Sequence, residues 1–350
     1  MSAKKSARRP IVLIVLLLLA IGGYVGFKYY RNYFAGNTAK AVNDKTYLYV
    51  RTGYTYADVL SELREKDFLK NVDAFDKVAK ERGYDDKVRP GRYRIKPGMS
   101  NLDIVRMLMG GKQEPVNVTF KSIRVKHDLA GRIGKVLEAD SLRLETLLGD
   151  EEFWKTNYGL TAENCLVLFL PDTYEMWWNT NAEDFIAKMA MEYKKFWTDE
   201  RKALAKAAGL SQSEVSILAS IVEKESNMSD ERPTIAGVYI NRLNKGIKLQ
   251  ADPTVVYALG DFTIKRVLSA DLQVNSPYNT YKYAGLPPGP ICLPSKNAID
   301  AVLNYKKHNY IYFCAKEDFS GYHNFAATYT EHLKNAAKFQ KALTARGINR

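Results

Sequence analysis

The stretch SQSEVSILASIVEKES, residues 211–226, decides the architecture of the second half of this chain. It opens with a capping box, because Ser211 can accept a hydrogen bond at the helix N-cap and Glu214 follows three residues later. Apolar residues then recur at helical spacing as far as residue 225. The stretch therefore predicts a helix that buries an apolar face against the rest of a domain.

This apolar face ends on a carboxylate, Glu225. Counting back from it by three, four and seven positions reaches Val222, Ile221 and Leu218, so Glu225 continues the face that must be buried. Glu223 lies on a different face of the same helix. Burial at the edge of an apolar pocket disfavours the charged form of a carboxyl group and raises its pKa. Glu225 is therefore a candidate general acid, which must hold a proton near neutral pH.

A second interpretation of Glu225 is structural. A glutamate near a helix end is commonly solvated or paired with a neighbouring cation, and Lys224 and Arg232 are available for such a pair. Spacing along the helix does not decide between a catalytic carboxylate and a surface one. The decision depends on the residues that surround Glu225 in the folded chain.

The N-terminal residues predict a membrane anchor. Basic residues between positions 4 and 9 precede an uninterrupted run of apolar residues and glycine from 11 to 27, long enough to span most of a bilayer. The basic residues favour a cytoplasmic tail at 1–9, followed by an anchor at 10–30 and a tether at 31–45. A cleaved signal peptide is disfavoured because the candidate cleavage triplet, 39–41, lies too far beyond the run. No cysteine follows the run closely, which excludes a lipoprotein anchor.

Residues 46–115 have the pattern of a small α/β module. Strand-like segments at 47–50 and 91–95 enclose helical segments at 56–63 and 73–82, and Ser100 caps a further helix that ends at two glycines. Residues 112–115 are the expected hinge to the next domain.

Residues 116–350 are typical of a larger domain with mixed helices and strands. A strand at 116–120 is followed by mainly helical sequence to residue 205, apart from an apolar run that we expect to end in a turn at 172–174. The remaining predicted segments are a helix at 231–244, loops at 249–294, a buried strand at 310–315, a return strand at 323–327 and a terminal helix after the Thr328 capping box. We therefore expect an α+β chain.

Composition excludes several classes of function. Cys165, Cys292 and Cys314 lie in apolar runs without a framework spacing, so each is expected to be a buried thiol and no disulfide is expected. The histidines are scattered at 127, 308, 323 and 332, which does not support a metal centre, and no cofactor is expected. Four charges of the +13 net charge belong to the N-terminal tail and the rest are spread through the chain without a basic run, so nucleic-acid binding is not expected.

The loops after residue 249 are rich in tyrosine, asparagine, glutamine and aspartate, which suits a carbohydrate ligand. Tyrosine rings pack against sugar faces and amides bridge hydroxyls, while the proline-rich segments restrict the loops that carry them. The sequence has no glycine-rich phosphate loop, no GxSxG nucleophile elbow and no cysteine with a persuasive histidine partner. Other substrate classes therefore have less support.

Several motifs occur in a defined order: PDTY (171–174), ASIVEKES (219–226), NRL (241–243), LQADPT (249–254), YNTY (278–281), GLPPG (285–289), YF (312–313) and HNF (323–325). Together they resemble the YceG-like (MltG) family of endolytic murein transglycosylases. The resemblance covers nearly the whole chain, including the anchor. It implies that residues 46–115 form a LysM-like module and that 116–350 form the catalytic domain.

The resemblance implies that Glu225, and not Glu223, is the catalytic acid of a peptidoglycan lytic transglycosylase. Such an enzyme cleaves the β-1,4 bond between N-acetylmuramic acid and N-acetylglucosamine within glycan strands and leaves a 1,6-anhydro end. A single carboxylate can perform both proton transfers, whereas hydrolysing glycosidases usually need two. The expected location is the bacterial inner membrane, with the catalytic domain on its periplasmic or outer face, where cleavage would limit elongation of nascent glycan.

Glycan strands are the expected binding partner, and peptidoglycan synthases and division proteins are the proteins that such an enzyme would work beside. The candidate substrate-binding residues, for each of which a loop-packing role stays open, are Gln250, Asp252, Thr254, Asn279, Tyr281, His323 and Phe325. Asp252 is also the candidate second carboxylate of a hydrolysing muramidase. A further alternative is a membrane-tethered peptidoglycan-binding or scaffold protein without catalysis.

Overall fold

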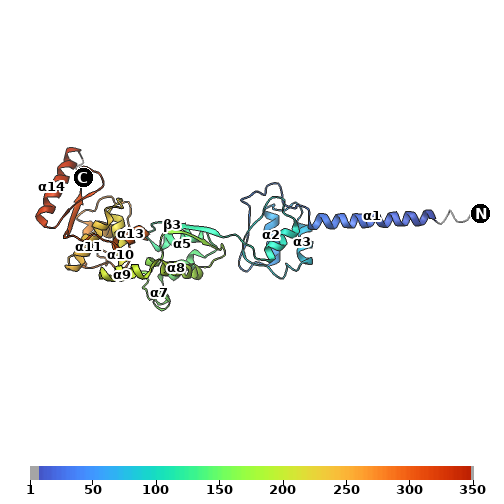
Figure 1. Cartoon of the computed structure of the whole chain (residues 1–350), viewed down its shortest axis with the longest axis horizontal. Coiled ribbons are helices and arrows are strands. Elements are labelled where there is room, and N and C mark those ends of the chain that lie inside the picture. The colour runs from blue at the N-terminus through green and yellow to red at the C-terminus, as the bar shows by residue number, and fades with distance from the viewer. Residues whose placement is uncertain (1–7, 348–350) are drawn as a thin grey trace, which may run out of the picture. The chain divides into compact units, whose positions relative to one another are not determined.

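The computed structural model describes residues 8–347 and divides into two compact units. The first runs up to Asn117 and includes Glu175–Thr180, and the second consists of Val118–Tyr174 and the residues from Asn181 onward (Figure 1). Helices and two-stranded sheets occur in both units, which confirms the expected α+β class. The domain boundaries expected from the sequence stay a prediction.

The N-terminal helix α1, Arg8–Tyr33, contains a segment, Ile11–Tyr33, that is long and apolar enough to cross a membrane (Figure 1). Its leucine, isoleucine and valine side chains are exposed, as they would be on a helix that faces lipid. By length and composition, this segment is consistent with the expected anchor. Most of the predicted cytoplasmic tail, residues 1–7, lies outside the described residues.

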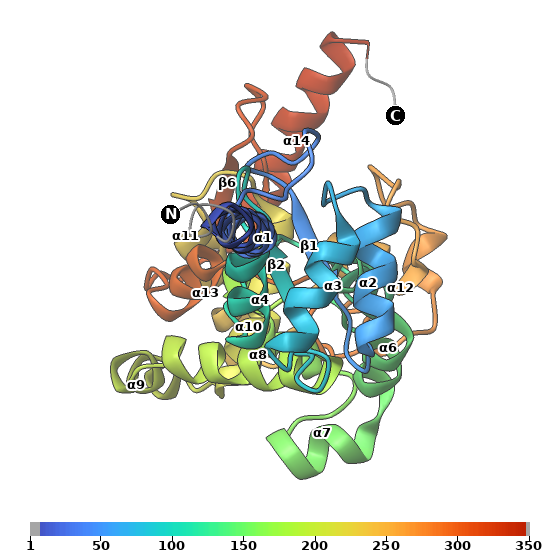
Figure 2. The ribbon, with the colours of Figure 1, turned by 90° about the vertical axis from the view of Figure 1, so that its right-hand side faces the viewer.

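The first unit continues with β1 (Tyr47–Val50), α2 (Tyr56–Glu65), α3 (Val72–Glu81), β2 (Gly91–Arg94) and α4 (Asn101–Met109), close to the predicted segments. β1 and β2 pair antiparallel, with Tyr47 opposite Arg94 and Val50 opposite Gly91. Figure 2 looks nearly along α1 and shows α2 and α3 beside each other. Their apolar faces contribute to a core that includes Leu48, Leu63, Phe75 and Tyr93.

The predicted tether packs with this module and does not form a free linker. Tyr33, Asn37 and Val42 are buried, and the two apolar side chains belong to the core of the module. The Asn37 amide donates to Asn101 Oδ1 at 2.6 Å and to the Asn71 carbonyl oxygen at 2.8 Å. Hydrophobic periodicity indicates helices and strands, so it does not reveal an irregular segment that is held by single apolar side chains and amide hydrogen bonds.

β3 (Val116–Phe120) pairs with β4 (Asp172–Met176) in a second two-stranded sheet. The predicted turn at 172–174 is therefore wrong, because these residues begin a strand in which Tyr174 and Met176 are buried and the intervening residue is exposed. Pro171 directly precedes the strand, a position where a proline is tolerated. The strand escapes prediction because its partner lies far away in the sequence.

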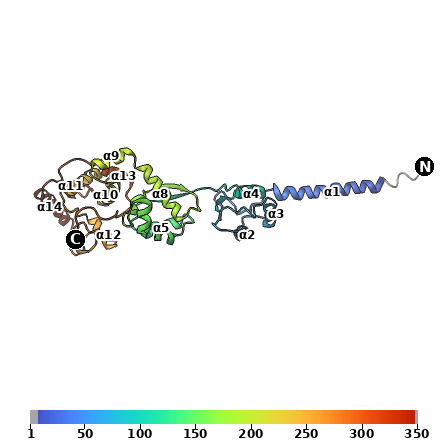
Figure 3. The same cartoon turned by 90° about the horizontal axis from the view of Figure 1, so that it is seen from below.

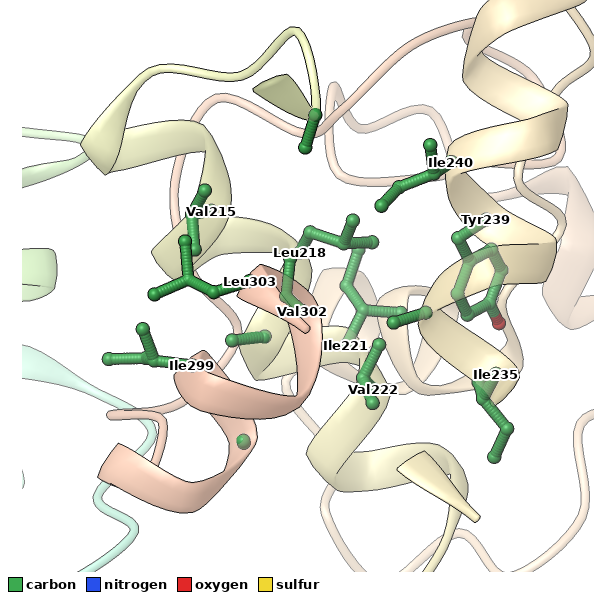
Figure 4. Close-up of a cluster of buried hydrophobic side chains, with 14 of the residues drawn as sticks. Val215, Leu218, Ile221, Val222, Ile235, Tyr239, Ile240, Ile299, Val302 and Leu303 are labelled. Carbon is green, nitrogen blue, oxygen red and sulfur yellow. The ribbon is translucent and has the colours of Figure 1, made fainter. Parts of the chain in front are cut away.

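The second unit is built around α10 (Gln212–Glu225), which Figure 3 shows among neighbouring helices. The helices α9 (Asp199–Ala207), α11 (Arg232–Asn244), α12 (Asp252–Leu259) and α13 (Lys296–Leu303) contact it. All residues from 215 to 222 are buried, including Ser216 and Ser220, so α10 is enclosed on more faces than its apolar stripe predicts. Figure 4 shows Leu218 and Ile221 packed among side chains of α11 and α13.

The other elements of this unit are α5 (Lys126–Gly134), α6 (Ser141–Gly149), α7 (Glu151–Tyr158), the 3-10 helices η1 (Cys165–Leu168) and η2 (Asp271–Gln273), α8 (Ala182–Phe196), β5 (Tyr312–Ala315), β6 (His323–Ala326) and α14 (Tyr329–Ala345). β5 pairs antiparallel with β6, and α14 packs on both.

Two expectations for the C-terminal hairpin need correction. β5 is half-buried along its length and not buried, because a two-stranded hairpin has no further strand beside it. Its thiol, Cys314, is half-buried for the same reason, whereas Cys165 and Cys292 are buried as expected. All three cysteines are free thiols.

Candidate active site

Glu225 is the last residue of α10 and lies at the edge of the helical core. Its carboxylate accepts a hydrogen bond from Tyr239 Oη of α11 at 2.5 Å. Lys224 instead donates to a serine hydroxyl at 2.9 Å, and Arg232 donates to a backbone carbonyl oxygen at 3.3 Å. Within the described residues, neither cation forms an ion pair with Glu225. The geometry therefore does not favour the interpretation of Glu225 as one half of a surface ion pair.

Burial raises the pKa of Glu225 to about 7. The Tyr239 hydrogen bond lowers this pKa and the negative charge of Asp252 raises it, each by less than burial does. Some of the side chain reaches solvent, yet the protein atoms packed around the carboxyl group remove much of the water that would stabilise its charge. Burial, with the charge of Glu225, also raises the pKa of Tyr239, which keeps its hydroxyl protonated as a donor. A carboxyl group with this pKa can donate a proton near neutral pH.

Glu223 has a different environment although it is only two residues away on α10. Its Oε2 accepts a hydrogen bond at 2.6 Å from the backbone N–H of Ser295, which is the N-cap of α13. Glu223 therefore joins two helices of the core, in keeping with the different face expected from the sequence.

Two cavities meet at Glu225 and Asp252, which line both of them. The first has a volume of about 260 Å³, and its walls include Arg124, Lys224, Tyr257, Phe262 and Lys265. The second has a volume of about 320 Å³, and its walls include Tyr239, Arg242, Gln250, Tyr281, Tyr312 and His332. A chain-like ligand that fills both cavities would pass the carboxyl group of Glu225.

The LQADPT segment brings two predicted residues to these walls. Asp252 is exposed in the first turn of α12 and accepts a hydrogen bond from Tyr281 Oη at 2.5 Å. Gln250 has a left-handed backbone, with φ of 53°, and its side-chain oxygen accepts a hydrogen bond from Arg242. Arg242 also donates to two backbone carbonyls, at 2.9 and 3.0 Å. Gln250, Asp252 and Tyr281 therefore lie together beside Glu225, as a shared binding site requires.

Thr254 and Asn279, by contrast, are buried and hydrogen-bond within the protein. Thr254 Oγ1 donates to a backbone carbonyl at 2.7 Å and lies 2.8 Å from Thr280 Oγ1. The Asn279 amide donates to two backbone carbonyls, at 2.9 and 2.8 Å. These contacts favour the loop-packing role that the sequence left open for both residues.

His323 and Phe325 lie on β6 and, within the described residues, line neither cavity. His323 Nδ1 lies 2.7 Å from one carboxylate oxygen of Glu231, whose other oxygen accepts the His323 backbone N–H at 2.8 Å. Ser226 Oγ also donates to this buried carboxylate, at 3.3 Å. Glu231 therefore ties β6 to the residue that follows Glu225, while Phe325 packs against the helical core.

The chain matches a known family. The family model described as YceG-like matches residues 48–338 of this chain. The chain belongs to the YceG-like family. Its relatives include proteins named endolytic murein transglycosylase from Streptococcus pneumoniae (serotype 2, strain D39) and Bacillus subtilis (strain 168).

The pneumococcal relative is 29% identical over 358 residues, which cover 93% of this YceG-like chain and 64% of that protein. The chain thus spans slightly less than two thirds of the length of this relative. The Bacillus relative is 30% identical over 307 residues, with 83% of each chain covered. A crystal structure of a YceG-like protein from Listeria monocytogenes is 28% identical, with a TM-score of 0.55, and the match covers 83% of this chain and 98% of that one.

Sequence reasoning missed several side chains of this YceG-like site. Tyr239 lies in the helix predicted at 231–244 and receives no role there, although the hydroxyl of a tyrosine on a buried helix face needs a partner and is a usable signal. Arg124, Lys265 and His332 also line the cavities, and no local pattern around them indicates it. Within residues 8–347, no group of three or more histidine, cysteine, aspartate or glutamate side chains could hold a metal ion.

Proposed function

We propose that this chain is an endolytic peptidoglycan lytic transglycosylase in which Glu225 acts as both acid and base. The bond cleaved is the β-1,4 bond between N-acetylmuramic acid and N-acetylglucosamine. The observation that carries the proposal is an enclosed carboxyl group, with a pKa raised to about 7, where two cavities meet. The names of the pneumococcal and Bacillus relatives support the same class of reaction.

In the first step, protonated Glu225 gives its proton to the glycosidic oxygen as the bond between that oxygen and C1 of the muramic residue breaks. The C6 hydroxyl of the same sugar then attacks C1, and Glu225, now a carboxylate, takes the hydroxyl proton. A 1,6-anhydro ring forms, no water is consumed and Glu225 ends the cycle protonated. Tyr239 donates a hydrogen bond to the carboxylate between the two steps and stabilises that charged form.

The two cavities support cleavage within a strand, because sugars on both sides of the scissile bond would have a wall to bind. Gln250 and Tyr281 lie on one of these walls and are the best-placed of the predicted substrate-binding residues. Tyrosine rings there suit sugar faces, and holding the C6 hydroxyl near C1 would favour the intramolecular attack.

The helix α1 would hold this enzyme in the bacterial inner membrane, with its N-terminus cytoplasmic and its catalytic domain on the periplasmic or outer face. From this position it would cleave nascent strands near the membrane and limit their elongation. Peptidoglycan synthases and division proteins would then be its neighbours.

A hydrolysing muramidase is the second candidate, because Asp252 lines both cavities together with Glu225. Ala251 is the N-cap of α12 and no side chain caps this helix, so Asp252, in the first turn, does not serve as a helix cap. As a base, Asp252 would activate water, and the products would carry reducing ends.

Mass spectrometry of glycan digested by the full chain in detergent tests the proposal. Anhydro ends are the expected product, and they should persist in Asp252→Asn. Reducing ends that disappear in Asp252→Asn would establish the muramidase instead. Sedimentation with sacculi without release of any soluble product would indicate a membrane-tethered wall-binding protein.

A further inference from the structure

The first cavity beside Glu225 has an excess of positive charge on its walls. Arg124, Lys224 and Lys265 line it, and the acidic residues on the same wall are Glu225 and Asp252. Because the raised pKa of Glu225 leaves it largely protonated below neutral pH, Asp252 is then the main negative charge that these cations face. The cavity therefore has a positive potential that favours an anionic ligand.

Among the residues that the structure describes, no carboxylate forms an ion pair with these cations. Within the described residues, Arg124 has no hydrogen bond or ion pair, and its guanidinium carbon lies 4.6 Å from the centre of the Phe262 ring. Lys265 is exposed and likewise has no ion-pair partner in the described part of the chain. The ammonium group of Lys224 donates to the Ser122 hydroxyl, a neutral acceptor, at 2.9 Å. Placing like charges around one cavity costs free energy that an anionic ligand would offset.

The second cavity has a different character. Arg242 on its wall is buried and already donates to Gln250 and to two backbone carbonyls. Tyrosine rings make up much of the remaining wall: Tyr239, Tyr281, Tyr312 and Tyr329. This wall suits the apolar faces of sugar rings, whereas the first cavity suits carboxylates.

Peptidoglycan supplies carboxylates at one place on its repeating unit, the substituent at the 3-position of muramic acid. In an intact strand this substituent carries a stem peptide with several carboxylates, and after amidase treatment it is a single free lactyl carboxylate. Three cations spread over one cavity match several carboxylates better than one.

We propose that the cavity lined by Arg124, Lys224 and Lys265 binds the carboxylates of the muramic 3-substituent, so that the substrate is glycan that still carries stem peptides. This inference rests on the proposed function, since it assumes that glycan strands occupy the site. The muramic residue would then enter the cationic cavity while neighbouring sugar rings lie along the tyrosine wall, which fixes the direction of the strand across Glu225.

Binding by the full chain carrying Glu225→Gln tests the inference without requiring catalysis. Peptide-bearing strands and amidase-treated strands of equal length are compared by calorimetry in detergent. We expect about tenfold tighter binding of the peptide-bearing strands, a difference that shrinks as salt is raised. Adding Lys265→Gln, or Arg124→Gln, should remove most of this difference.

Two further variants separate charge from packing. Arg266→Gln removes the same charge from the residue next to Lys265, which is exposed and does not line the cavity among the described residues, so it should leave the preference unchanged. Arg124→Lys keeps the charge but alters the contact with Phe262, and it should retain most of the preference.

The outcomes of the binding comparison distinguish the ligand of the cavity from the activity of the chain. If amidase-treated strands bind more tightly and Lys265→Gln abolishes this difference, the cavity is a carboxylate site whose ligand is the free lactyl group. That result would overturn the part of the inference that concerns stem peptides. Equal binding of both strands by all variants would overturn the inference. The Glu225→Gln chain could prefer peptide-bearing strands while the wild-type chain releases no anhydro product. That result would overturn the proposed function and leave the inferred binding site intact.

Discussion

At the N-terminal end of α10, Glu214 completes a capping box with Ser211, whereas at the C-terminal end Glu225 has Tyr239 as its hydrogen-bond donor. The Glu214 carboxylate accepts the Ser211 backbone N–H at 2.8 Å, and the Ser211 hydroxyl accepts the Glu214 backbone N–H at 3.2 Å. Glu214 is exposed and lies at the end of the helix where the dipole favours a negative charge. Glu214 therefore faces solvent, takes part in the helix cap and lies at the favourable end of the helix dipole.

Glu225 has none of these advantages except one hydrogen bond. It lies at the end of the helix where the dipole disfavours a negative charge, it is enclosed, and the described residues supply no cation to pair with it. The same residue type on the same helix therefore stabilises the fold at one end and retains a proton at the other. The difference shows that position in the packed core, and not residue type, makes a glutamate suitable for acid chemistry.

Glu225→Gln should produce the largest effect, because it removes the acid while keeping the size of the side chain. We expect glycan cleavage to fall by about 10²–10⁴-fold, the range for loss of a general acid and base. Release of anhydro products by liquid chromatography and mass spectrometry measures the change. Glu223→Gln is the matched control and should keep much of the activity; equal rates for Glu225→Gln and the wild type would contradict the assignment.

The second prediction concerns stability. The pKa of Glu225 is raised from 4.5 to about 7, so below pH 4.5 both folded and unfolded chains hold the proton. Between pH 4.5 and about pH 7 the unfolded chain releases the Glu225 proton while the folded chain retains it. The free energy of unfolding therefore falls as pH rises to about 7. Glu225→Gln removes this penalty. It should raise the free energy of unfolding at pH 8 by up to about 3 kcal/mol relative to the wild type, with little change at pH 4.

Urea denaturation of both proteins at pH 4 and pH 8 measures the difference. A variant that is less stable than the wild type at pH 8 would show that Glu225 contributes to the fold as an anion, as Glu214 does. The contrast between the two ends of α10 would then be lost.

Tyr239→Phe should have a smaller effect with a distinctive pH dependence. The hydrogen bond from Tyr239 lowers the pKa of Glu225, so its removal should shift the alkaline limb of the pH–rate profile to higher pH. A weaker acid also protonates the leaving oxygen more slowly, and we expect about a tenfold lower rate at pH 6. Tyr174→Phe, which removes a buried hydroxyl bound to a backbone carbonyl, should leave the profile in place. An unchanged profile for Tyr239→Phe would mean that its role is only packing.

Local features of the fold could be predicted from the sequence because their determinants lie within a few residues. The helix caps predicted at Ser100, Ser211 and Thr328 all form, each as a capping box that fixes the start of a helix. The position of Glu225 at the end of an apolar face could be predicted for the same reason, because it follows from helical spacing, whereas its role as the acid stays a prediction.

Features that depend on distant partners could not be predicted. β4 forms because β3 lies beside it, and no property of 172–176 alone indicates that partner. The hydroxyl of Tyr239 meets Glu225 only because α11 packs on α10. Thr254 belongs to a polar motif but is buried against Thr280, so composition suggests ligand binding where the structure shows a contact between α12 and a loop.

Ser211→Ala should have the smallest effect and tests whether the two ends of α10 act independently. Loss of an N-cap hydroxyl costs about 1 kcal/mol of stability, while the cleavage rate per folded molecule should not change. The two ends of this helix are about 20 Å apart at 1.5 Å per residue, so the effects of Ser211→Ala and Glu225→Gln on the free energy of unfolding should add within about 0.5 kcal/mol. Urea denaturation of the double variant at pH 8 measures this additivity. A larger departure would show that the cap helps to hold Glu225 in its enclosed position, because only a shift of the whole helix connects the two ends.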